Sequence, residues 1–127
     1  MLYEKGTVFD GREVLPAGHA VLVEAGRIQA VGPGDGFAGY QGPRFDLGGD
    51  TLLPGLIDCH VHLTMSGDGK TVAGLGNDHA ALTLQALENA QASLRGGITA
   101  LRDCGGIDHV LFAVRDACNA GRFLGPF

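Results

Sequence analysis

The stretch that decides the fold is residues 53–62, which read Leu-Pro-Gly-Leu-Ile-Asp-Cys-His-Val-His. A Pro-Gly pair opens an apolar run, and two histidines separated by one residue end it. Because successive side chains of a β-strand point to opposite faces, the spacing predicts that His60 and His62 share one face of a strand. The other positions are expected to alternate likewise, with Leu56 and Asp58 on the histidine face and Ile57, Cys59 and Val61 on the opposite face.

The two histidines are the predicted metal ligands. A strand rises about 3.3 Å per residue, so the two imidazoles begin about 6.6 Å apart and can converge on one ion. Metal–nitrogen bonds of about 2.0–2.1 Å close that gap without distorting the strand. A bare His-x-His tripeptide more often marks two polar residues that face water at the end of a strand, so the neighbouring sequence has to decide.

Composition restricts the class of protein. The chain has 127 residues, of which 45 % are hydrophobic, and a mean hydropathy of +0.14, which is typical of a folded globular domain rather than of a disordered chain. The net charge of −5 disfavours a nucleic-acid partner or an anionic membrane surface, since both would require a basic face. No secretory signal is recognisable, and no stretch approaches the roughly 18 apolar residues of a membrane span.

The cysteines indicate the compartment. Cys59, Cys104 and Cys118 are an odd number at wide spacing, without a Cys-x-x-Cys pair. This pattern favours small buried side chains in a reducing environment over a disulfide framework or a zinc knuckle. A cytoplasmic location is therefore expected.

Two regions of different pattern are expected, at residues 1–52 and 53–127. The first contains only short strands, predicted at 7–11 and 45–47, together with a hairpin formed by residues 20–24 and 27–31. The second changes to the order strand, helix, strand, helix. Its strands are predicted at 53–62 and 98–104, and residues 123–127 are expected to approach a third strand. The first helix is expected to be capped by Asn77 or Asp78 and to end at Gly96 or Gly97, with apolar positions Ala80, Leu84, Leu87, Ala90 and Leu94. The second helix is predicted over 107–120, with apolar positions Ile107, Leu111, Val114 and Cys118.

This order predicts an α/β fold that begins a (β/α)8 barrel. Two strand–helix units and the start of a third are about a quarter of such a barrel, which needs around 250 residues. An open pair of strands would leave apolar faces and unpaired edges. The chain is therefore expected to be the N-terminal part of a longer enzyme.

Residues 52–63 resemble the first barrel strand of the amidohydrolase superfamily. The family pattern is a Pro-Gly turn, two apolar residues, Asp, any residue, His, any residue and His, and each fixed position is present. Residues 6–11 and 24–28 are similar to the small β-sandwich that precedes the barrel in many amidohydrolases. Residues 97–103 and 117–126 are similar to the branch that contains imidazolonepropionases and prolidase-like Xaa-Pro dipeptidases.

The resemblance implies hydrolysis of an amide, cyclic amide, dipeptide or related bond in a small-molecule substrate by metal-activated water. It implies that His60 and His62 bind a divalent ion, with zinc expected from the imidazole ligands and one or two ions left open. The family's other ligands, a fourth-strand lysine, histidines on the fifth and sixth strands and an aspartate on the eighth, would lie on strands that this chain lacks. Two histidines alone should hold metal weakly and catalyse little. Thr64 stands where dihydroorotase-like members carry an arginine, which disfavours that subtype.

Other polar residues are weaker candidates. Asp58 is expected to be a structural hydrogen-bond acceptor. Asp103 ends the second strand and is expected either to support the metal site or substrate, or to cap the next loop or pair with Arg102. Solvated positions are expected for His79 and His109, at the starts of the two helices. The Gly69-Lys70-Thr71 tripeptide resembles the end of a phosphate-binding loop, but that loop requires a glycine five residues before Gly69, where this chain has Thr64, so this interpretation is rejected. Residues 64–76 are instead interpreted as a loop at the mouth of the site.

Two alternatives to an enzyme remain open at this point. One is a structural relative that has lost its metal, although such loss would normally remove the histidine pair. The other is a short protein that completes its barrel with a partner. Homo-oligomerisation of the complete protein is also left open.

Overall fold

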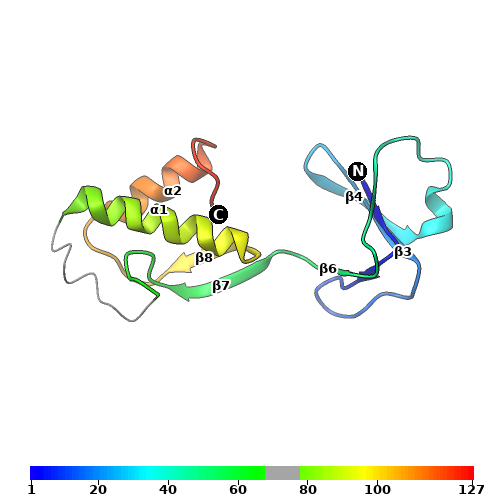
Figure 1. Ribbon diagram of the computed structural model, residues 1–127, viewed down its shortest axis with the longest axis horizontal. Helices are drawn as coiled ribbons and strands as arrows, with labels where there is room; N and C mark the ends of the chain where they lie inside the picture. The colour runs from blue at the N-terminus through cyan, green and yellow to red at the C-terminus, as the bar shows by residue number, and fades with distance from the viewer. Residues whose placement is uncertain (68–77) are drawn as a thin grey trace. The chain divides into compact units, whose positions relative to one another are not determined.

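The computed structural model describes residues 1–67 and 78–127 of the chain. The chain divides into two compact units, Met1–Pro54 and Gly55–Phe127, close to the boundary predicted between residues 52 and 53 (Figure 1). The units are considered one at a time. The predicted cap Asn77, the Gly69-Lys70-Thr71 tripeptide and most of the loop 64–76 lie outside the described residues.

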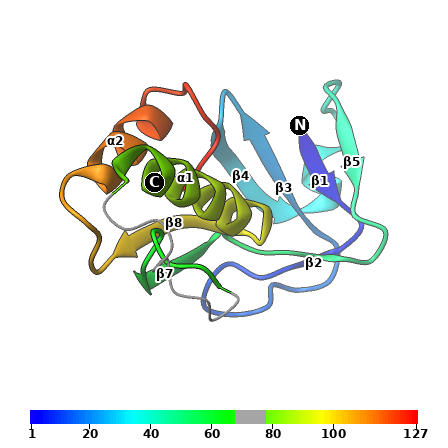
Figure 2. The ribbon, with the colours of Figure 1, turned by 60° about the vertical axis from the view of Figure 1, so that its left-hand side comes forward.

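The first unit contains a four-stranded sheet in the order β4-β3-β1-β5 (Figure 2). The predicted hairpin is confirmed, because β3 and β4 pair antiparallel. Its turn is Ala25-Gly26, and both residues have positive φ, 50° and 72°, as a two-residue turn that follows the twist of the strands requires. The four strands are β1 (Leu2–Glu4), β3 (His19–Glu24), β4 (Arg27–Pro33) and β5 (Arg44–Asp46).

A second, smaller pairing completes this unit. β2 (Thr7–Val8) pairs parallel with β6 (Thr51–Leu52), and a short 3-10 helix, η1 (Gly34–Phe37), lies in the loop after β4. The strand predicted at 7–11 is shorter because the Asp10 carboxylate accepts hydrogen bonds from two main-chain N–H groups that follow it and closes a turn. The buried apolar residues of the unit are Leu2, Val8, Ala20 and Val21.

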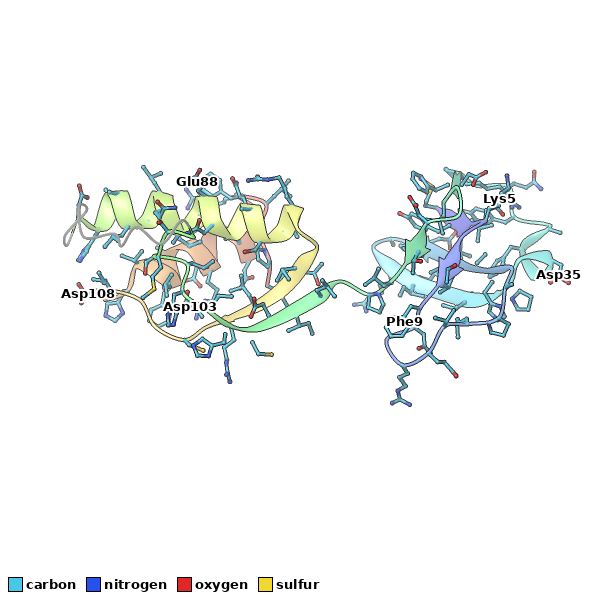
Figure 3. All side chains as sticks on the ribbon, turned by 60° about the horizontal axis from the view of Figure 1, so that its bottom comes forward. Lys5, Phe9, Asp35, Glu88, Asp103 and Asp108 are labelled. Carbon is cyan, nitrogen blue, oxygen red and sulfur yellow. The ribbon has the colours of Figure 1, made fainter. Side chains whose placement is uncertain are left out.

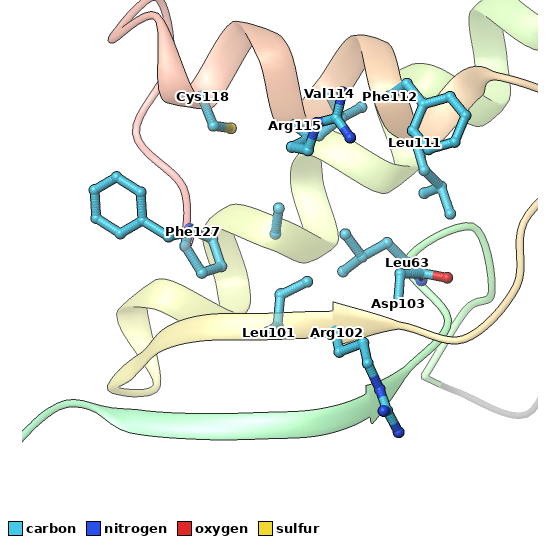
Figure 4. Close-up of a pocket in the computed structure, with 12 residues that line it drawn as sticks. Leu63, Leu101, Arg102, Asp103, Leu111, Phe112, Val114, Arg115, Cys118 and Phe127 are labelled. Atoms are coloured by element: carbon cyan, nitrogen blue, oxygen red, sulfur yellow. The ribbon is translucent and has the colours of Figure 1, made fainter.

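The second unit has the mixed α/β order predicted from the sequence. Strands β7 (Leu56–Val61) and β8 (Ile98–Asp103) pair parallel, and helices α1 (His79–Arg95) and α2 (Val110–Asn119) follow them in turn. Both helices lie on the same side of the strand pair (Figures 1 and 4). Within the described residues of this unit, neither helix covers the other side of the pair.

The predicted ends of α1 are confirmed, but its buried residues differ from the predicted ones. Asp78 caps the helix by accepting hydrogen bonds from two main-chain N–H groups, and Gly97, at a φ of 90°, supplies the left-handed residue after its end. The buried residues are Leu82, Ala86 and Ala90, of which only Ala90 was predicted. The expected core residue Leu84 is 68 % exposed, and Ala80 is exposed as well.

The error has a physical reason. The buried positions are four residues apart and include two alanines, which allow the helix to approach its neighbours closely. A large leucine two positions away from this row lies roughly 200° round the helix, on the opposite side. The apolar pattern therefore placed Ala80 and Leu84 on the buried face wrongly, whereas the predicted Leu87 packs against the core and Leu94 is half-buried.

α2 begins later than predicted. Asp108 has a φ of 50°, which a right-handed helix cannot include, so the helix starts at Val110 and Ile107 stays outside it. Buried Val114 of α2 belongs to one core cluster with Leu63, Ala86 and Ala90. The partly buried apolar residues packed against this cluster are Val61, Leu87, Leu101, Leu111 and Cys118.

The C-terminal segment runs along β8. The Phe127 N–H donates to the Thr99 carbonyl at 3.0 Å, and its carbonyl accepts from the Leu101 N–H at 2.8 Å, which is the hydrogen-bond pattern of parallel strands. A pocket of about 340 Å³ lies between β8, α2 and this segment, lined in part by Leu101, Cys118 and Phe127 (Figure 4). Within residues 1–67 and 78–127, every helix is too short or too polar to cross a bilayer.

Candidate metal centre

The histidine pair lies at the carboxyl end of β7. His60 is inside the strand, and His62 is the first residue after it, so the strand is shorter at both ends than the predicted 53–62. The pairing with β8 shifts register between Asp58 and Val61, a β-bulge that interrupts strict alternation. Of the three residues predicted to line the face opposite the histidines, Val61 packs against the core, whereas Ile57 is 69 % exposed and Cys59 is also exposed.

The bulge does not separate the two imidazoles. The ring centroids of His60 and His62 are 5.3 Å apart, and the ring planes meet at 71°. A ligating imidazole places its centroid about 3.2 Å from the ion, given a metal–nitrogen bond of about 2.1 Å, so two such rings at a tetrahedral angle have centroids about 5.2 Å apart. The observed separation therefore fits two rings that share one tetrahedral ion.

A hydrogen bond defines which nitrogen of His62 is free. Its Nδ1 lies 3.0 Å from the carbonyl oxygen of Gly105, which can only accept. The proton must therefore be on Nδ1, and the lone pair is on Nε2. Histidines that bind metals are usually held in this way by a carbonyl or carboxylate on the second nitrogen.

Asp58 and Asp103 both accept hydrogen bonds from the main chain. The half-buried Asp58 accepts from the His60 N–H at 3.0 Å, as expected for a structural acceptor. Asp103, at the end of β8, accepts from the Leu63 N–H at 2.7 Å and from the Gly105 N–H at 2.9 Å. Both of its carboxylate oxygens thus hold loops beside the histidine pair.

The predicted pairing of Asp103 with its neighbour Arg102 is wrong. The Arg102 side chain points away from the helices, and its Nε donates to the Cys59 carbonyl at 2.9 Å (Figure 4). Adjacent residues of a strand face opposite sides, so the two side chains cannot meet without leaving the strand geometry. Of the roles considered for Asp103, the structure shows the loop cap.

Sequence reasoning missed Asn89 of α1. Its Nδ2 donates to the Leu63 carbonyl and to the Met65 carbonyl, each at 2.7 Å. The only local signal was a polar amide adjacent to the buried Ala90, on a half-buried part of the helix. Its partners are more than twenty residues earlier in the chain, so no spacing pattern within the helix could have identified them.

The remaining histidines have partners of their own. His79 forms an ion pair with Asp108, with its Nε2 2.8 Å from the carboxylate. His109 stacks on Phe112, with ring centroids 5.6 Å apart. Neither of these contacts involves the pair at the end of β7.

The prediction that the cysteines are buried is largely wrong. Cys59 and Cys104 are exposed. Only Cys118 is partly covered, as a member of the packing around the core, and this burial raises the pKa of its thiol.

The donor set is incomplete in the described part of the chain. Within residues 1–67 and 78–127, no group of three or more His, Cys, Asp or Glu side chains is placed to hold a metal ion. A catalytic zinc requires about three protein ligands and an open position for water. The histidine pair fits part of such a site, and further ligands would have to come from elsewhere.

The amidohydrolase family model matches residues 51–127. The imidazolonepropionase of Cereibacter sphaeroides is 44 % identical over 61 residues, which cover 48 % of this chain and 15 % of that protein. A crystal structure of a Xaa-Pro dipeptidase with bound methionine in the active site superposes with a TM-score of 0.82 and 25 % identity, over 98 % of this chain and 31 % of that one. The structure of molinate hydrolase gives a TM-score of 0.79 and 29 % identity, over 98 % of this chain and 28 % of that one.

These relatives are much longer than the region they share with this chain, which spans about 15 % of the imidazolonepropionase and less than a third of either solved structure. The matched region nevertheless includes β7, α1, β8, α2 and both histidines, and it is more than half of the chain. The chain belongs to the amidohydrolase family.

Proposed function

We propose that the chain is part of a metal-dependent hydrolase that cleaves carbon–nitrogen bonds in a small-molecule substrate, and that His60 and His62 are two of its metal ligands. One observation carries the proposal. The two rings are 5.3 Å apart, and the proton of His62 is committed to the Gly105 carbonyl, so that Nε2 is available as a ligand. Together the two features fit a pair of imidazoles that bind one ion.

The chain's own residues hold and orient the ion. Neutral imidazole nitrogens suit zinc well among the divalent ions, so zinc is the ion we propose. The Gly105 carbonyl fixes the His62 ring, and the Asp58 carboxylate fixes the main-chain N–H of His60. A divalent ion bound there would lower the pKa of a water molecule to about 7 and polarise the carbonyl group of the substrate.

The class of substrate follows from the relatives only in general terms. An imidazolonepropionase, a Xaa-Pro dipeptidase and molinate hydrolase are all similar to this chain, which supports an amide, cyclic amide, dipeptide or related bond as the target. A barrel completed by further strands, a cytoplasmic location and homo-oligomerisation stay predictions. The 127-residue chain alone is expected to bind zinc weakly and to be inactive, because two ligands do not complete a catalytic site.

The test uses the complete gene product, purified in the presence of zinc. Metal content and hydrolysis of imidazolonepropionate and of Xaa-Pro dipeptides are measured for the unmodified protein and for His60→Ala, His62→Ala and His79→Ala. The first two variants should lose at least one ion and most of the activity against any substrate that is turned over. His79→Ala should retain both, because His79 pairs with Asp108 instead of the ion. An unmodified protein without bound metal would contradict the proposal.

A further inference from the structure

We propose that Asn89 and Asp103 are positioning residues that hold His62 as a metal ligand by fixing the main chain of residues 63–65. These two side chains, together with the main-chain N–H and carbonyl groups of Leu63, are called the Leu63 clamp below. The inference rests on the proposed function, since it gives the clamp its purpose. It assigns a role to a helix residue and to a strand-end carboxylate that sequence reasoning did not connect.

The clamp holds the residue next to His62 by both of its main-chain polar groups. Asp103 accepts from the Leu63 N–H at 2.7 Å, and Asn89 donates to the Leu63 carbonyl at 2.7 Å. Asn89 also donates to the Met65 carbonyl at 2.7 Å, and the Met65 N–H donates to the His62 carbonyl at 3.0 Å. The turn that follows the second histidine is thus tied to β8 through Asp103 and to α1 through Asn89.

Water cannot easily replace the two contacts to Leu63. Leu63 is 8 % exposed and Thr64 is 5 % exposed, so the middle of the turn is buried, although Met65 and His60 are exposed and His62 is half-buried. A main-chain polar group that loses its partner in such a place stays unsatisfied, unless the turn moves toward solvent. A movement of that kind would displace His62, which is joined directly to Leu63.

The same carboxylate also controls the His62 ring. Asp103 Oδ1 accepts from the Gly105 N–H at 2.9 Å, and the carbonyl of Gly105 receives the His62 Nδ1 proton at 3.0 Å. Asp103 therefore fixes His62 twice, through the peptide that follows it and through the carbonyl that holds its imidazole. Figure 4 shows the Asp103 side chain beside Leu63 at the end of β8.

Two conservative substitutions remove the clamp one half at a time. Asp103→Asn keeps the shape of the side chain but leaves only one acceptor oxygen for the two main-chain N–H groups. The amide NH2 group then faces the N–H group that has lost its acceptor. Asn89→Asp removes both donors and places carboxylate oxygens against two carbonyl oxygens. The matched controls are Asp108→Asn and Glu88→Gln, which change exposed carboxylates in the loop before α2 and on the face of α1 away from the strands (Figure 3).

The first measurement is made on the 127-residue chain without metal. At pH about 8 an ordinary imidazole, with a pKa of about 6.5, is neutral, and its nitrogen chemical shifts report the tautomer. His62 should have its proton on Nδ1 in the unmodified chain and in both controls. Asp103→Asn and Asn89→Asp should shift it toward a mixture of tautomers. A destabilised second unit would also disturb the contact of His79 Nε2 with the Asp108 carboxylate, so the His79 resonances serve as the internal reference for that unit in the clamp variants.

The second measurement is zinc affinity, by competition with a chelator. Loss of a group that supports a metal ligand typically weakens binding about 10–100-fold, and this is the expected effect of each clamp variant, while the controls stay within about twofold. An unchanged His62 tautomer in folded clamp variants, or unchanged zinc affinity in them, would overturn the inference. If one variant does not fold, the other half of the clamp gives the same two readouts.

Failure of the proposed function is recognised separately. It would appear as absence of zinc binding in the unmodified chain and in the unmodified complete gene product, before any substitution. In that case the clamp would have no role in metal binding. The tautomer measurement would still show whether the clamp holds the His62 imidazole. Zinc binding to the unmodified proteins combined with insensitivity to the clamp variants would overturn the positioning role alone.

Discussion

Replacement of Leu82 by Ala tests which face of α1 is buried. Leu82 is fully buried, whereas Leu84, two residues later on the same helix, is 68 % exposed. Leu→Ala removes three carbons, which at about 0.8 kcal/mol each amounts to about 2.4 kcal/mol of lost burial. The cavity left behind adds to this, so Leu82→Ala should destabilise the second unit by about 3 kcal/mol, within the range of about 2–5 kcal/mol for buried leucines.

The matched variant Leu84→Ala should cost far less. About a third of its side chain leaves water, so the lost burial is roughly 0.8 kcal/mol, and the better helix propensity of alanine returns a few tenths. Urea unfolding followed by circular dichroism measures both. With a slope of about 1–3 kcal/mol per M, Leu82→Ala should lower the midpoint by about 1–3 M, or unfold the unit in water if its stability is smaller than the loss. Equal effects of the two variants would refute the assignment of the buried face.

Three further substitutions, two of them a matched pair, test the loop after β8 and the first unit. Gly106→Ala should destabilise the second unit by roughly 1–3 kcal/mol, because an added Cβ would overlap Leu111. Gly105→Ala should change the stability of this unit by less than about 1 kcal/mol, because its added Cβ would meet His62 at an ordinary 3.7 Å. The urea midpoints of the two variants are compared. Lys5→Met should raise the pKa of Asp46, which the hydrogen bond from Lys5 Nζ at 2.8 Å now holds below its ordinary value, and a carboxyl titration by NMR measures the change.

The sign of the pH effect follows from the direction of that shift. A lowered carboxyl pKa adds stability that is present above the ordinary value of about 3.9 and is lost as the pH falls through the lowered value in the folded protein. Lys5→Met should therefore reduce the loss of stability below pH about 4. Asp10 is the internal control, because main-chain hydrogen bonds from Glu13 and Arg12 lower its pKa, and the substitution should leave it unchanged. An Asp46 pKa unaffected by Lys5→Met would count against the ion pair.

The elements that sequence predicted well are set by neighbouring residues. The Asp78 cap, the Gly97 stop and the hairpin turn at Ala25-Gly26 depend on the chemistry of a few consecutive positions. The short strands β1 and β6 were not predicted. Their existence depends on partners far along the chain.

The features that sequence missed are long-range. Alternation identified the pair His60 and His62, but it could not show the bulge in β7, which depends on the register with β8. Nor could it show that Asn89 and Asp103 both contact the main chain of Leu63, because these two residues come from different elements and Leu63 lies outside both. The metal pair could be proposed from local spacing, whereas its supports required the fold.

The most direct test of the account is a zinc titration of the chain, observed through the imidazole nitrogens of its histidines. The chemical shifts of the ring nitrogens of His60 and His62 should change together as zinc is added, with one dissociation constant and one ion per chain. In His62 the nitrogen whose chemical shift changes should be Nε2. His79 should stay unperturbed over the same range. Independent responses of the two rings, or a response no greater than that of His79, would contradict the claim that they share one ion.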